Sequence, residues 1–283
     1  MATVKIRHLE GRFTGAGGIN LFRQGWVPKQ GLRAVVCLVH GIGEHSGRYE
    51  HLASWLAARR FAVETFDLRG HGHSDGPRNY TRSFDRYLED LQIKLDQIRS
   101  EYTGVPLFLL GHSMGGTIVT WYVIREQPNI SGLIVSAPSI VVSDDISPVL
   151  VRLSSVMGAL LPRLPTVKLD TSALSRDPDV VRRYDQDPLV YHRGVRARTG
   201  AELFRAMAAI RENMEAIRLP LLIIQGTEDH LVDPAGSKLL YEKVASEDKT
   251  LHLYEGFYHE SFNDPENLRV FGDLLAWLDA RTD

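Results

Sequence analysis

The sequence predicts an α/β fold, in which helices cover both faces of a mostly parallel central sheet and a helical segment is inserted between two strands. The first observation is a set of short, continuous apolar runs, which suit parallel strands buried on both faces. The second is that helical patterns separate these runs, as right-handed strand–helix–strand crossovers require. The runs are residues 34–39, 61–66, 106–110, 132–136, 221–224 and 250–253.

Two further strands and two clear helices complete the predicted sheet domain. Residues 4–9 and 19–26 predict a small antiparallel pair, with a turn at the glycine-rich residues 15–18. The first helix has apolar residues three and four apart at Phe84, Leu88, Leu91, Leu95 and Ile98. The second follows the start signal Asp264-Pro265 and has the same spacing at Leu268, Phe271, Leu274, Leu275 and Leu278.

The alternation of strands and helices stops between Ala137 and Leu219. Roughly 80 residues without a convincing strand are too many for a loop in a compact domain. We therefore predict a helical cap at residues 139–218, with the sheet domain built from residues 1–138 and 219–283. The cap opens with a helix over residues 146–165, which is crowded with the apolar residues Val149, Leu150, Leu153, Val156, Met157, Leu160 and Leu161.

Composition restricts the classes of function. The 283 residues are 43% apolar and 24% charged, which is ordinary for a globular chain, and the net charge of −2 offers no basic surface for nucleic acid. Cys37 is the single cysteine, so a reducing compartment is permitted. Residues 1–20 contain no signal-peptide core, and no segment approaches the roughly 18 apolar residues that span a bilayer. We expect a soluble, cytoplasmic chain; no feature predicts its oligomeric state.

A candidate nucleophile lies at residues 111–115, which read G-H-S-M-G and match the nucleophile-elbow pattern G-x-S-x-G. The pattern requires a sharp turn between a strand and a helix, with small neighbours around a strained serine. Here the run 106–110 precedes Ser113, and a helical pattern from Gly115 to about Glu126 follows it. We therefore predict that Ser113 is the nucleophile of a covalent mechanism.

The same five-residue pattern occurs a second time, at residues 72–76 around Ser74. A loop separates Ser74 from the preceding strand, and Pro77 follows at once with no helical period behind it. The surrounding structure that a nucleophile needs is therefore missing, and we interpret Ser74 as a turn residue.

A base must accept the serine proton, and a carboxylate must orient that base. In a sheet of this kind the order along the chain is serine, acid, histidine, each in a loop at the carboxyl end of a strand. Asp229 follows the run 221–224 and His259 follows the run 250–253, so we predict them as the acid and the base.

Three other residues compete for these roles. Asp233 precedes Pro234 and is typical of a helix N-cap. His252 alternates with leucines, which indicates a strand residue that faces away from the core. His230 lies beside Asp229, on the wrong loop to serve as the base.

Backbone N–H groups must stabilise the negative oxygen of a tetrahedral intermediate. One donor is the residue after the nucleophile, Met114. The second comes from the loop after an early strand, residues 40–43, whose glycines permit close approach of the backbone. We predict Ile42 as this donor; its apolar side chain is no obstacle, because the backbone donates.

Residues 71–75 offer a metal-dependent alternative. They contain two histidines and an aspartate, and His40 and His45 lie elsewhere in the chain, so the residue types that hold zinc are present. A metallohydrolase would leave the strand–turn–helix pattern around Ser113 unexplained. We therefore predict no metal and no other cofactor, and expect the histidines of residues 71–75 to hydrogen-bond within their loop.

Motifs longer than G-x-S-x-G run through the chain. They are residues 40–49 (HGIGEHSGRY), 69–74 (RGHGHS), 111–116 (GHSMGG), 174–178 (LSRDP), 187–189 (DPL) and 254–260 (YEGFYHE). Together they resemble the monoacylglycerol lipases, a family of serine hydrolases in the α/β-hydrolase superfamily. The resemblance covers nearly the whole chain and includes the cap, so it implies an α/β-hydrolase fold with an inserted helical cap.

The resemblance also implies an activity, the hydrolysis of monoacylglycerols to fatty acid and glycerol through an acyl-serine intermediate, without a cofactor. The family's motifs assign the nucleophile to Ser113, the base to His259 and the orienting acid to Asp229. They assign the oxyanion donors to Ile42 and Met114, in agreement with the assignments made above from the residues alone.

Substrate contacts implied by the resemblance are less direct. It places a narrow polar pocket for glycerol near Glu44, Arg48, His112 and Tyr184, and a cap that closes an apolar acyl tunnel and contacts membranes or micelles. Glu44 and Arg48 have an alternative role as a loop ion pair that positions the oxyanion loop. The apolar helix of the cap either forms a tunnel wall or interfacial patch, or packs on the sheet.

Two alternative functions remain: another serine hydrolase with a different substrate, and a binding protein without catalytic activity. A general carboxylesterase or a lysophospholipase would use the same triad on another lipid ester. A binding module that has lost a triad member would have no activity, although candidates for all three members are present here.

Overall fold

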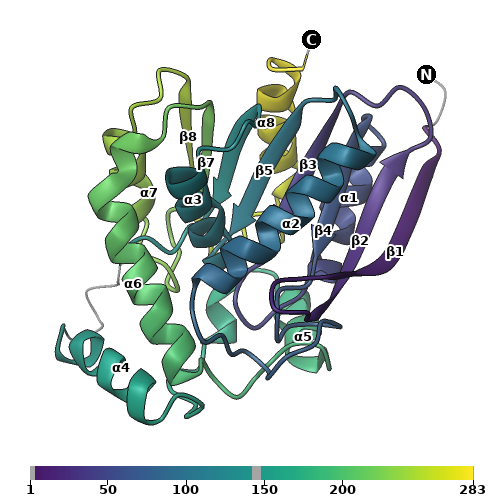
Figure 1. Ribbon diagram of the computed structural model, residues 1–283. Coiled ribbons are helices and arrows are strands. Elements are labelled where there is room, and N and C mark those ends of the chain that lie inside the picture. Colours follow the sequence, from purple (N-terminus) through teal and green to yellow (C-terminus); the bar gives the residue numbers. More distant parts are fainter. Residues whose placement is uncertain (1–3, 142–147, 283) are drawn as a thin grey trace.

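The computed structural model describes residues 4–141 and 148–282, and the side chains of residues 148–152 lie outside this description. The described strands form one sheet with the order β1-β2-β4-β3-β5-β6-β7-β8 (Figure 1). β1 and β2 pair antiparallel, as do β2 and β4, and all the other neighbours are parallel. The strands are β1 (Ile6–Thr14), β2 (Asn20–Pro28), β3 (Ala34–Val39), β4 (Phe61–Phe66), β5 (Leu107–His112), β6 (Gly132–Ser136), β7 (Leu221–Gly226) and β8 (Lys249–Tyr254).

The predicted strands are all present, and three of them, β3, β4 and β6, have the predicted bounds. β5 and β7 continue two residues further at their carboxyl ends than their apolar runs. The ladder continues there because His112 pairs with Ser136, and Gly226 pairs with Tyr254. Polar and glycine residues at these ends are therefore fixed by strand pairing just before the chain enters the loops that carry the predicted chemistry.

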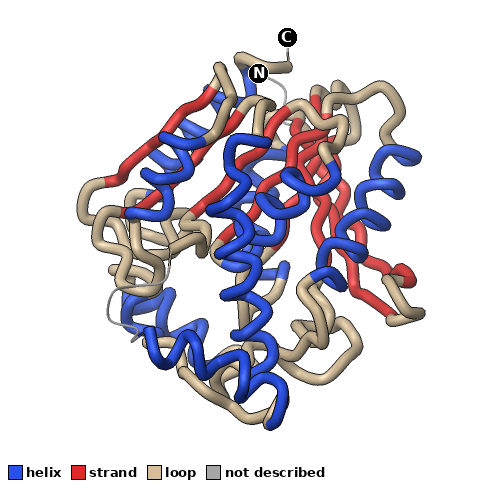
Figure 2. The backbone as a smooth tube through the Cα atoms, turned by 60° about the vertical axis from the view of Figure 1, so that its left-hand side comes forward, coloured by secondary structure: helices blue, strands red, loops and turns tan. Residues whose placement is uncertain are grey.

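Helices cover both faces of the sheet, which confirms the predicted α/β fold (Figure 2). α2 (Asp85–Glu101), α3 (Met114–Glu126) and α7 (Ala235–Lys243) share one apolar core with one face of the sheet. α1 (Glu50–Ala57) and α8 (Asn267–Asp279) pack on the other face, behind the sheet in Figure 1.

The two predicted helical stripes are largely buried. Every stripe residue of α2 is buried, together with Phe84 just before it. In α8 the prediction for Leu268 is wrong, because Leu268 is 65% exposed in the first turn. The buried stripe of α8 instead begins at Val270 and Phe271 and includes Trp277, so it lies slightly around the helix from the predicted one.

The segment between β6 and β7, residues 139–218, is called the cap segment here. Its described residues form helices, and the pairing of Pro165 with Arg196 is an isolated antiparallel bridge among them. The helices are α4 (Pro148–Leu160), η2 (Thr171–Ala173), α5 (Pro178–Gln186), α6 (Ala197–Asn213) and η3 (Met214–Ala216). α6 packs against both α4 and α3, so it connects the outer cap to the sheet domain (Figure 1).

The apolar helix of the cap is shorter than predicted. α4 ends at Leu160 rather than at residue 165, because Pro162 lacks an N–H group and disfavours helical geometry at Leu161. The predicted residues 146 and 147 lie outside the described part of the chain. α4 packs on α6 through Gly158, where an added Cβ would lie 2.9 Å from the Ala201 Cβ.

The outer side of α4 and the chain after it form an exposed apolar patch. Its members are Leu153, Val156, Leu160, Leu161, Leu164 and Val167, with exposed fractions of 45%, 52%, 74%, 55%, 41% and 64%. Side chains with this much exposure are not packed on the sheet. For these residues, the alternative in which the apolar helix of the cap packs on the sheet is therefore excluded. In the ranges 4–141 and 148–282, the structure has no helix with the length and apolarity needed to cross a bilayer.

Candidate active site

Ser113 occupies the sharp turn between β5 and α3. Its backbone has φ 54° and ψ −122°, a region that side chains other than glycine rarely adopt. Small neighbours make the turn possible. A Cβ on Gly111 would lie 2.4 Å from the Gly115 oxygen, and one on Gly115 would lie 2.2 Å from the Val39 oxygen. The sequence therefore needs glycine at both positions to hold the serine in its strained turn.

His259 and Asp229 meet although they lie on different loops. Nδ1 of His259 and Oδ2 of Asp229 are 2.8 Å apart, and both side chains are buried. Asp229 also accepts hydrogen bonds from the N–H groups of Leu231 and Val232 at 2.9 Å and from the Gln225 amide at 3.0 Å. Four donors thus fix the carboxylate, which in turn fixes the tautomer and orientation of the imidazole.

The electrostatics of this pair suit an acid–base role. Burial would lower the pKa of His259, but the charge and hydrogen bond of Asp229 raise that pKa above its ordinary value. Burial would raise the pKa of Asp229, and His259 together with backbone N–H groups hold it below its ordinary value. The carboxylate therefore stays ionised, and its charge favours the protonated form of the imidazole.

His112 lies directly before Ser113 and beside His259. The two imidazole rings are 4.8 Å apart, and Nδ1 of His112 lies 3.2 Å from Oγ of Ser136. Burial, followed by repulsion from His259, lowers the pKa of His112 to about 4. His112 is neutral near pH 7, so it adds no second positive charge to the site.

The loop after β3 places backbone groups against Ser113. A Cβ added to Gly41 would lie 3.2 Å from the Ser113 Cβ, so the glycine backbone lies next to the serine. Ile42 follows, and Gly43 has φ 78°, which turns the chain back toward the cap segment. Met114 is the first residue of α3, where a helix N–H has no intrahelical acceptor.

Glu44, Arg48 and Glu260 form a buried charge cluster behind this loop. Glu44 accepts hydrogen bonds from the Gly41 N–H at 2.6 Å and from the Tyr49 hydroxyl at 2.7 Å. Arg48 donates to Glu44 at 2.7 Å and to both oxygens of Glu260, at 2.5 and 2.7 Å. The predicted loop ion pair is therefore present, and it connects the loop after β3 to the residue after His259.

The ionisation of this cluster follows from its geometry. Burial would raise the pKa of Glu44, but Arg48 and then the neighbouring histidines hold it well below its usual range. Burial would lower the pKa of Arg48, and the two carboxylates raise it. Glu44 therefore faces the site as a carboxylate whose oxygens already have partners.

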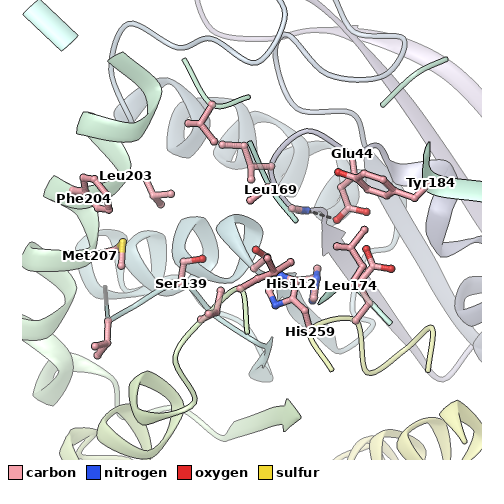
Figure 3. Close-up of a pocket in the computed structure, with 18 residues that line it drawn as sticks. Glu44, His112, Ser139, Leu169, Leu174, Tyr184, Leu203, Phe204, Met207 and His259 are labelled. Carbon is pink, nitrogen blue, oxygen red and sulfur yellow. Dashed lines mark hydrogen bonds between the residues drawn. The ribbon is translucent and has the colours of Figure 1, made fainter. Parts of the chain in front are cut away.

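A cavity of about 140 Å³ brings the predicted residues together (Figure 3). Ser113, His259, His112, Glu44 and Tyr184 all line it. Its other end is apolar, with Leu203, Phe204 and Met207 of α6 lying opposite the histidines in Figure 3. Further apolar lining comes from Val141, Leu169, Leu174, Val195, Leu231 and Val232.

Arg48 lies on the other side of Tyr184. Its guanidinium carbon is 4.6 Å from the centre of the Tyr184 ring, and it lines a neighbouring cleft rather than the cavity at Ser113. Burial, assisted by the Glu44 charge, raises the pKa of the Tyr184 phenol above its ordinary value. Tyr184 therefore presents a neutral hydroxyl at the polar end of the cavity.

The competing serine has a structural role, and neither competing histidine lines the cavity at Ser113. The Ser74 hydroxyl donates to the Asp67 carbonyl at 2.5 Å and accepts from the Phe22 N–H at 2.9 Å, so Ser74 holds a turn. His230 is exposed beside Glu228, and His252 lies within β8.

Asp233 and the histidines of residues 71–75 hydrogen-bond within their own loops. The N-cap residue of α7 is Pro234 rather than Asp233, and Asp233, one position earlier, accepts a hydrogen bond from the Ala235 N–H at 2.8 Å. His71 contacts the Arg69 carbonyl at 3.0 Å, and the His73 N–H donates to Asp67 at 2.7 Å. Across the described ranges, no three His, Cys, Asp or Glu side chains gather in a way that could hold a metal ion.

Sequence reasoning missed two residues of the site, Gln225 and Glu260. Gln225 is the polar residue in the otherwise apolar run of β7, and a buried amide in that position needs a partner such as Asp229. Glu260 follows His259 directly, and a carboxylate there needs a cation such as Arg48. Both signals are weak, because the partners lie on other loops.

A serine in a strained elbow after a parallel strand, with acid and base on later loops in that order, is the arrangement of α/β-hydrolase-fold serine hydrolases. This chain is a member of that class. The family described as "Serine aminopeptidase, S33" matches residues 30–266. The chain is 39% identical over 269 residues to a monoacylglycerol lipase of Mycolicibacterium smegmatis, which covers 95% of this chain and 96% of that protein.

Further similarities agree with this one. A monoglyceride lipase of Rattus norvegicus is 37% identical, over 94% of this chain and 89% of that protein. The solved structure of a monoacylglycerol lipase from Paleococcus ferrophilus matches with a TM-score of 0.83 and 37% identity, over 92% of this chain and 99% of that chain. The chain belongs to the monoacylglycerol lipase family, as its sequence motifs predicted.

Proposed function

We propose that this enzyme hydrolyses monoacylglycerols to free fatty acid and glycerol. The observation that carries the proposal is the two-ended cavity at Ser113, which is apolar toward α6 and polar toward Glu44 and Tyr184. An ester bound with its carbonyl at Ser113 would place an acyl chain along the apolar end. The polar end would then hold a small polyhydroxylated alcohol, whose hydroxyl groups need hydrogen-bond partners when they leave water.

In the first step, Oγ of Ser113 attacks the ester carbonyl while Nε2 of His259 accepts the serine proton. The negative charge that develops on the carbonyl oxygen is stabilised by the N–H groups of Ile42 and Met114. The intermediate then collapses: the bond from the acyl carbon to the glyceryl oxygen breaks, and His259 returns its proton to that oxygen. Glycerol leaves, and Ser113 carries the acyl group.

In the second step, water attacks the acyl-serine ester. His259 accepts a proton from the water, and the same N–H groups stabilise the second tetrahedral intermediate. Collapse breaks the bond to Oγ of Ser113, which regains a proton from His259, and the fatty acid is released. Asp229 keeps its charge throughout and stabilises the imidazolium form of His259.

Glycerol recognition is assigned to the polar end of the cavity. Glu44 and Tyr184 line that end, and His112, beside His259, lines the same cavity. Arg48 acts from behind, through Glu44 and the face of Tyr184, rather than by touching the substrate. A simple alkyl ester has no hydroxyl groups that could hydrogen-bond at this end, so the glyceryl ester should be preferred.

The cap segment, residues 139–218, is proposed as a separate unit that covers the site and contacts lipid surfaces. The apolar patch on and after α4 exposes Leu160 and Leu161 by 74% and 55%, and such patches mark interaction sites on otherwise soluble proteins. Sedimentation with phosphatidylcholine vesicles tests this: Leu160→Ser with Leu161→Ser should lower binding severalfold. Leu253→Ser, at a 39% exposed leucine of β8, is the control and should bind like wild type. Equal binding of all three proteins contradicts the proposal.

The test of the activity is kcat/KM for monooleoylglycerol against methyl oleate, with Ser113→Ala as the blank. A preference of at least about tenfold for the glyceryl ester is expected, because its hydroxyl groups hydrogen-bond at the polar end of the cavity and the methyl group of methyl oleate cannot. Equal rates would contradict glycerol recognition and favour a carboxylesterase that recognises the acyl chain alone. Preference for a lysophospholipid over monooleoylglycerol would favour the lysophospholipase alternative.

A further inference from the structure

The loop that carries His259 is bonded directly to the cap segment. The Glu260 N–H donates to the Leu174 carbonyl at 2.8 Å, and the Ser175 hydroxyl lies 3.1 Å from the Asn263 carbonyl. Leu174 and Ser175 belong to the short connection between η2 and α5, and both are buried. The connection, residues 174–177, therefore packs in the interior against the loop between β8 and α8, residues 255–266, which is called the base loop here.

Asp264 is the centre of this contact. It is 1% exposed, and its Oδ1 accepts hydrogen bonds from the Ser175 hydroxyl at 2.9 Å and from the Arg176 N–H at 2.8 Å. Its Oδ2 accepts from the Tyr258 N–H at 2.9 Å and from Nε of Arg176 at 3.2 Å. One carboxylate thus joins backbone groups of two segments that lie far apart in the sequence.

Arg176 strengthens the same connection from the cap side. Its guanidinium carbon lies 4.6 Å from the centre of the Phe257 ring, and it donates to both Asp264 and Glu266. Arg176 therefore touches the base loop on both sides of His259. A single side chain of the cap segment therefore contacts this loop at Phe257, Asp264 and Glu266.

The consequence for His259 follows from the chain itself. The residue before it, Tyr258, is held through its N–H by Asp264, and the residue after it, Glu260, is held through its N–H by Leu174. The backbone on both sides of the base is therefore bonded to the cap segment or to its partner carboxylate. Asp229 orients the imidazole ring. The backbone bonds of Tyr258 and Glu260 fix the position of the backbone from which that side chain extends.

We propose that Asp264 and Arg176 are positioning residues for the catalytic base, and that residues 174–177 form a fixed brace for the base loop rather than part of a moving lid. The role of the brace in catalysis rests on the proposed function, because it assumes that His259 is the base. On this view the cap segment has two parts: the brace, bonded to the sheet domain, and α4, which contacts α6 and exposes its apolar side.

The brace can be tested through the His259–Asp229 bond. Asp264→Asn replaces one acceptor oxygen by an NH₂ group, which faces donors and cannot accept from them. Arg176→Met removes the cation but keeps the carboxylate and should be milder, and Arg176→Lys should restore part of the loss. Asp179→Asn is the control, because Asp179 pairs with Arg182 on the exposed side of α5.

The first readout is the proton resonance of Nδ1–H of His259, which a short bond to a carboxylate shifts far downfield; His259→Gln assigns it. This measurement requires no activity, so it tests the brace even if the proposed substrate is wrong. The second readout is the pH profile of kcat/KM with 4-nitrophenyl butyrate, an ester without glycerol. The charged and titratable groups that face His259 are Asp229, Glu260, Glu44 and His112.

Three results are expected for Asp264→Asn, and smaller ones for Arg176→Met. The resonance moves upfield or disappears, the acid limb of the profile moves to lower pH, and kcat falls about tenfold to hundredfold with KM within about twofold of wild type. Asp179→Asn changes none of these. The proposal is overturned if folded Arg176→Met and Asp264→Asn both keep the resonance, the acid limb and kcat of wild type. Should Asp264→Asn fail to fold, the comparison of Arg176→Met with Arg176→Lys decides.

Discussion

Arg48→Met is the substitution whose effect the structure predicts in most detail. Arg48 is buried between two carboxylates, Glu44 and Glu260, and donates three hydrogen bonds to them. Methionine is shorter than arginine and carries no charge, but its unbranched chain fills part of the same space. The substitution therefore removes the cation and keeps part of the packing.

The magnitude follows from what remains around the carboxylates. Removing one partner of a buried ion pair costs about 3–5 kcal/mol, because an uncompensated charge stays in the interior. Glu44 keeps the Gly41 N–H and the Tyr49 hydroxyl, and Glu260 keeps the Asn263 amide. We expect the free energy of unfolding to fall by about 4 kcal/mol at pH 7, a large part of the about 5–15 kcal/mol typical of a domain.

The pH dependence of the loss has a definite sign. In the wild type the pKa of Glu44 is held below its ordinary value of about 4.3, so its ionised form stabilises the fold above that pH. Without Arg48, burial dominates and raises the pKa of Glu44 above about 4.3, so its ionised form destabilises the fold at pH 7. Protonation relieves that penalty, and the gap between wild type and Arg48→Met should shrink as the pH falls toward 5.

Urea unfolding followed by circular dichroism at pH 8, 7, 6 and 5 measures this gap. Two variants make the result specific. Adding Glu44→Gln and Glu260→Gln to Arg48→Met should restore most of the loss, because no charge is then left unpaired. Arg182→Met, which breaks an exposed pair with Asp179, should change stability by less than about 0.5 kcal/mol. A gap below about 1 kcal/mol at pH 7, or one that stays constant down to pH 5, would refute the reasoning.

Three further predictions concern activity. Ser113→Ala should lower kcat by at least about 10³-fold, whereas Ser74→Ala should keep kcat within about twofold and lose about 1–3 kcal/mol of stability, because it leaves buried backbone groups without partners. Since only neutral His259 accepts a proton, kcat/KM should rise with pH, with a midpoint above about 6.5. Asp229→Asn should lower that midpoint, because it removes the main group that raises the pKa of His259. Phe204→Ala should raise kcat/KM for octadecanoylglycerol relative to octanoylglycerol severalfold, at about 0.8 kcal/mol per additional buried methylene.

Each of these has a result that would contradict it. Wild-type kcat in Ser113→Ala, or a strong loss of kcat in Ser74→Ala, would reverse the choice between the two serine motifs. An acid limb that stays in place in Asp229→Asn would mean that Asp229 is not what raises the pKa of His259. A parallel change for all chain lengths in Phe204→Ala, with no change of preference, would remove α6 from the acyl-binding surface.

The sheet could be predicted from the sequence because its strands are buried on both faces and therefore read as continuous apolar runs. Where a run and a strand differ, the backbone is the reason. β5 extends to His112 because that residue pairs with Ser136, although its side chain is polar. α4 ends at Leu160, although apolar side chains continue, because Pro162 follows. Neither the end of β5 nor the end of α4 could be predicted from the polarity of the side chains alone.

The residues of the candidate site fall into two groups: those that a local sequence pattern indicates, and those that meet only in the folded chain. The elbow around Ser113 could be recognised because its glycines, strand and helix are all local in sequence. Arg48 and Glu260 are 212 positions apart, and Ser175 and Asp264 are 89 apart, so no local pattern indicates that they meet. Buried polar partners of this kind become predictable only when the fold brings their loops together.

The insertion of the cap between β6 and β7 has a consequence for exchanging parts between related enzymes. The two strands are paired from Leu133 with Leu221 to Ser136 with Ile224, so the inserted chain leaves and re-enters the sheet between neighbours. An insert of another length could therefore join the same two strands without changing their register. The role proposed for Asp264 sets a separate condition. A transplanted cap segment must carry residues equivalent to Ser175 and Arg176, because without them the histidine of the recipient enzyme would lose its alignment.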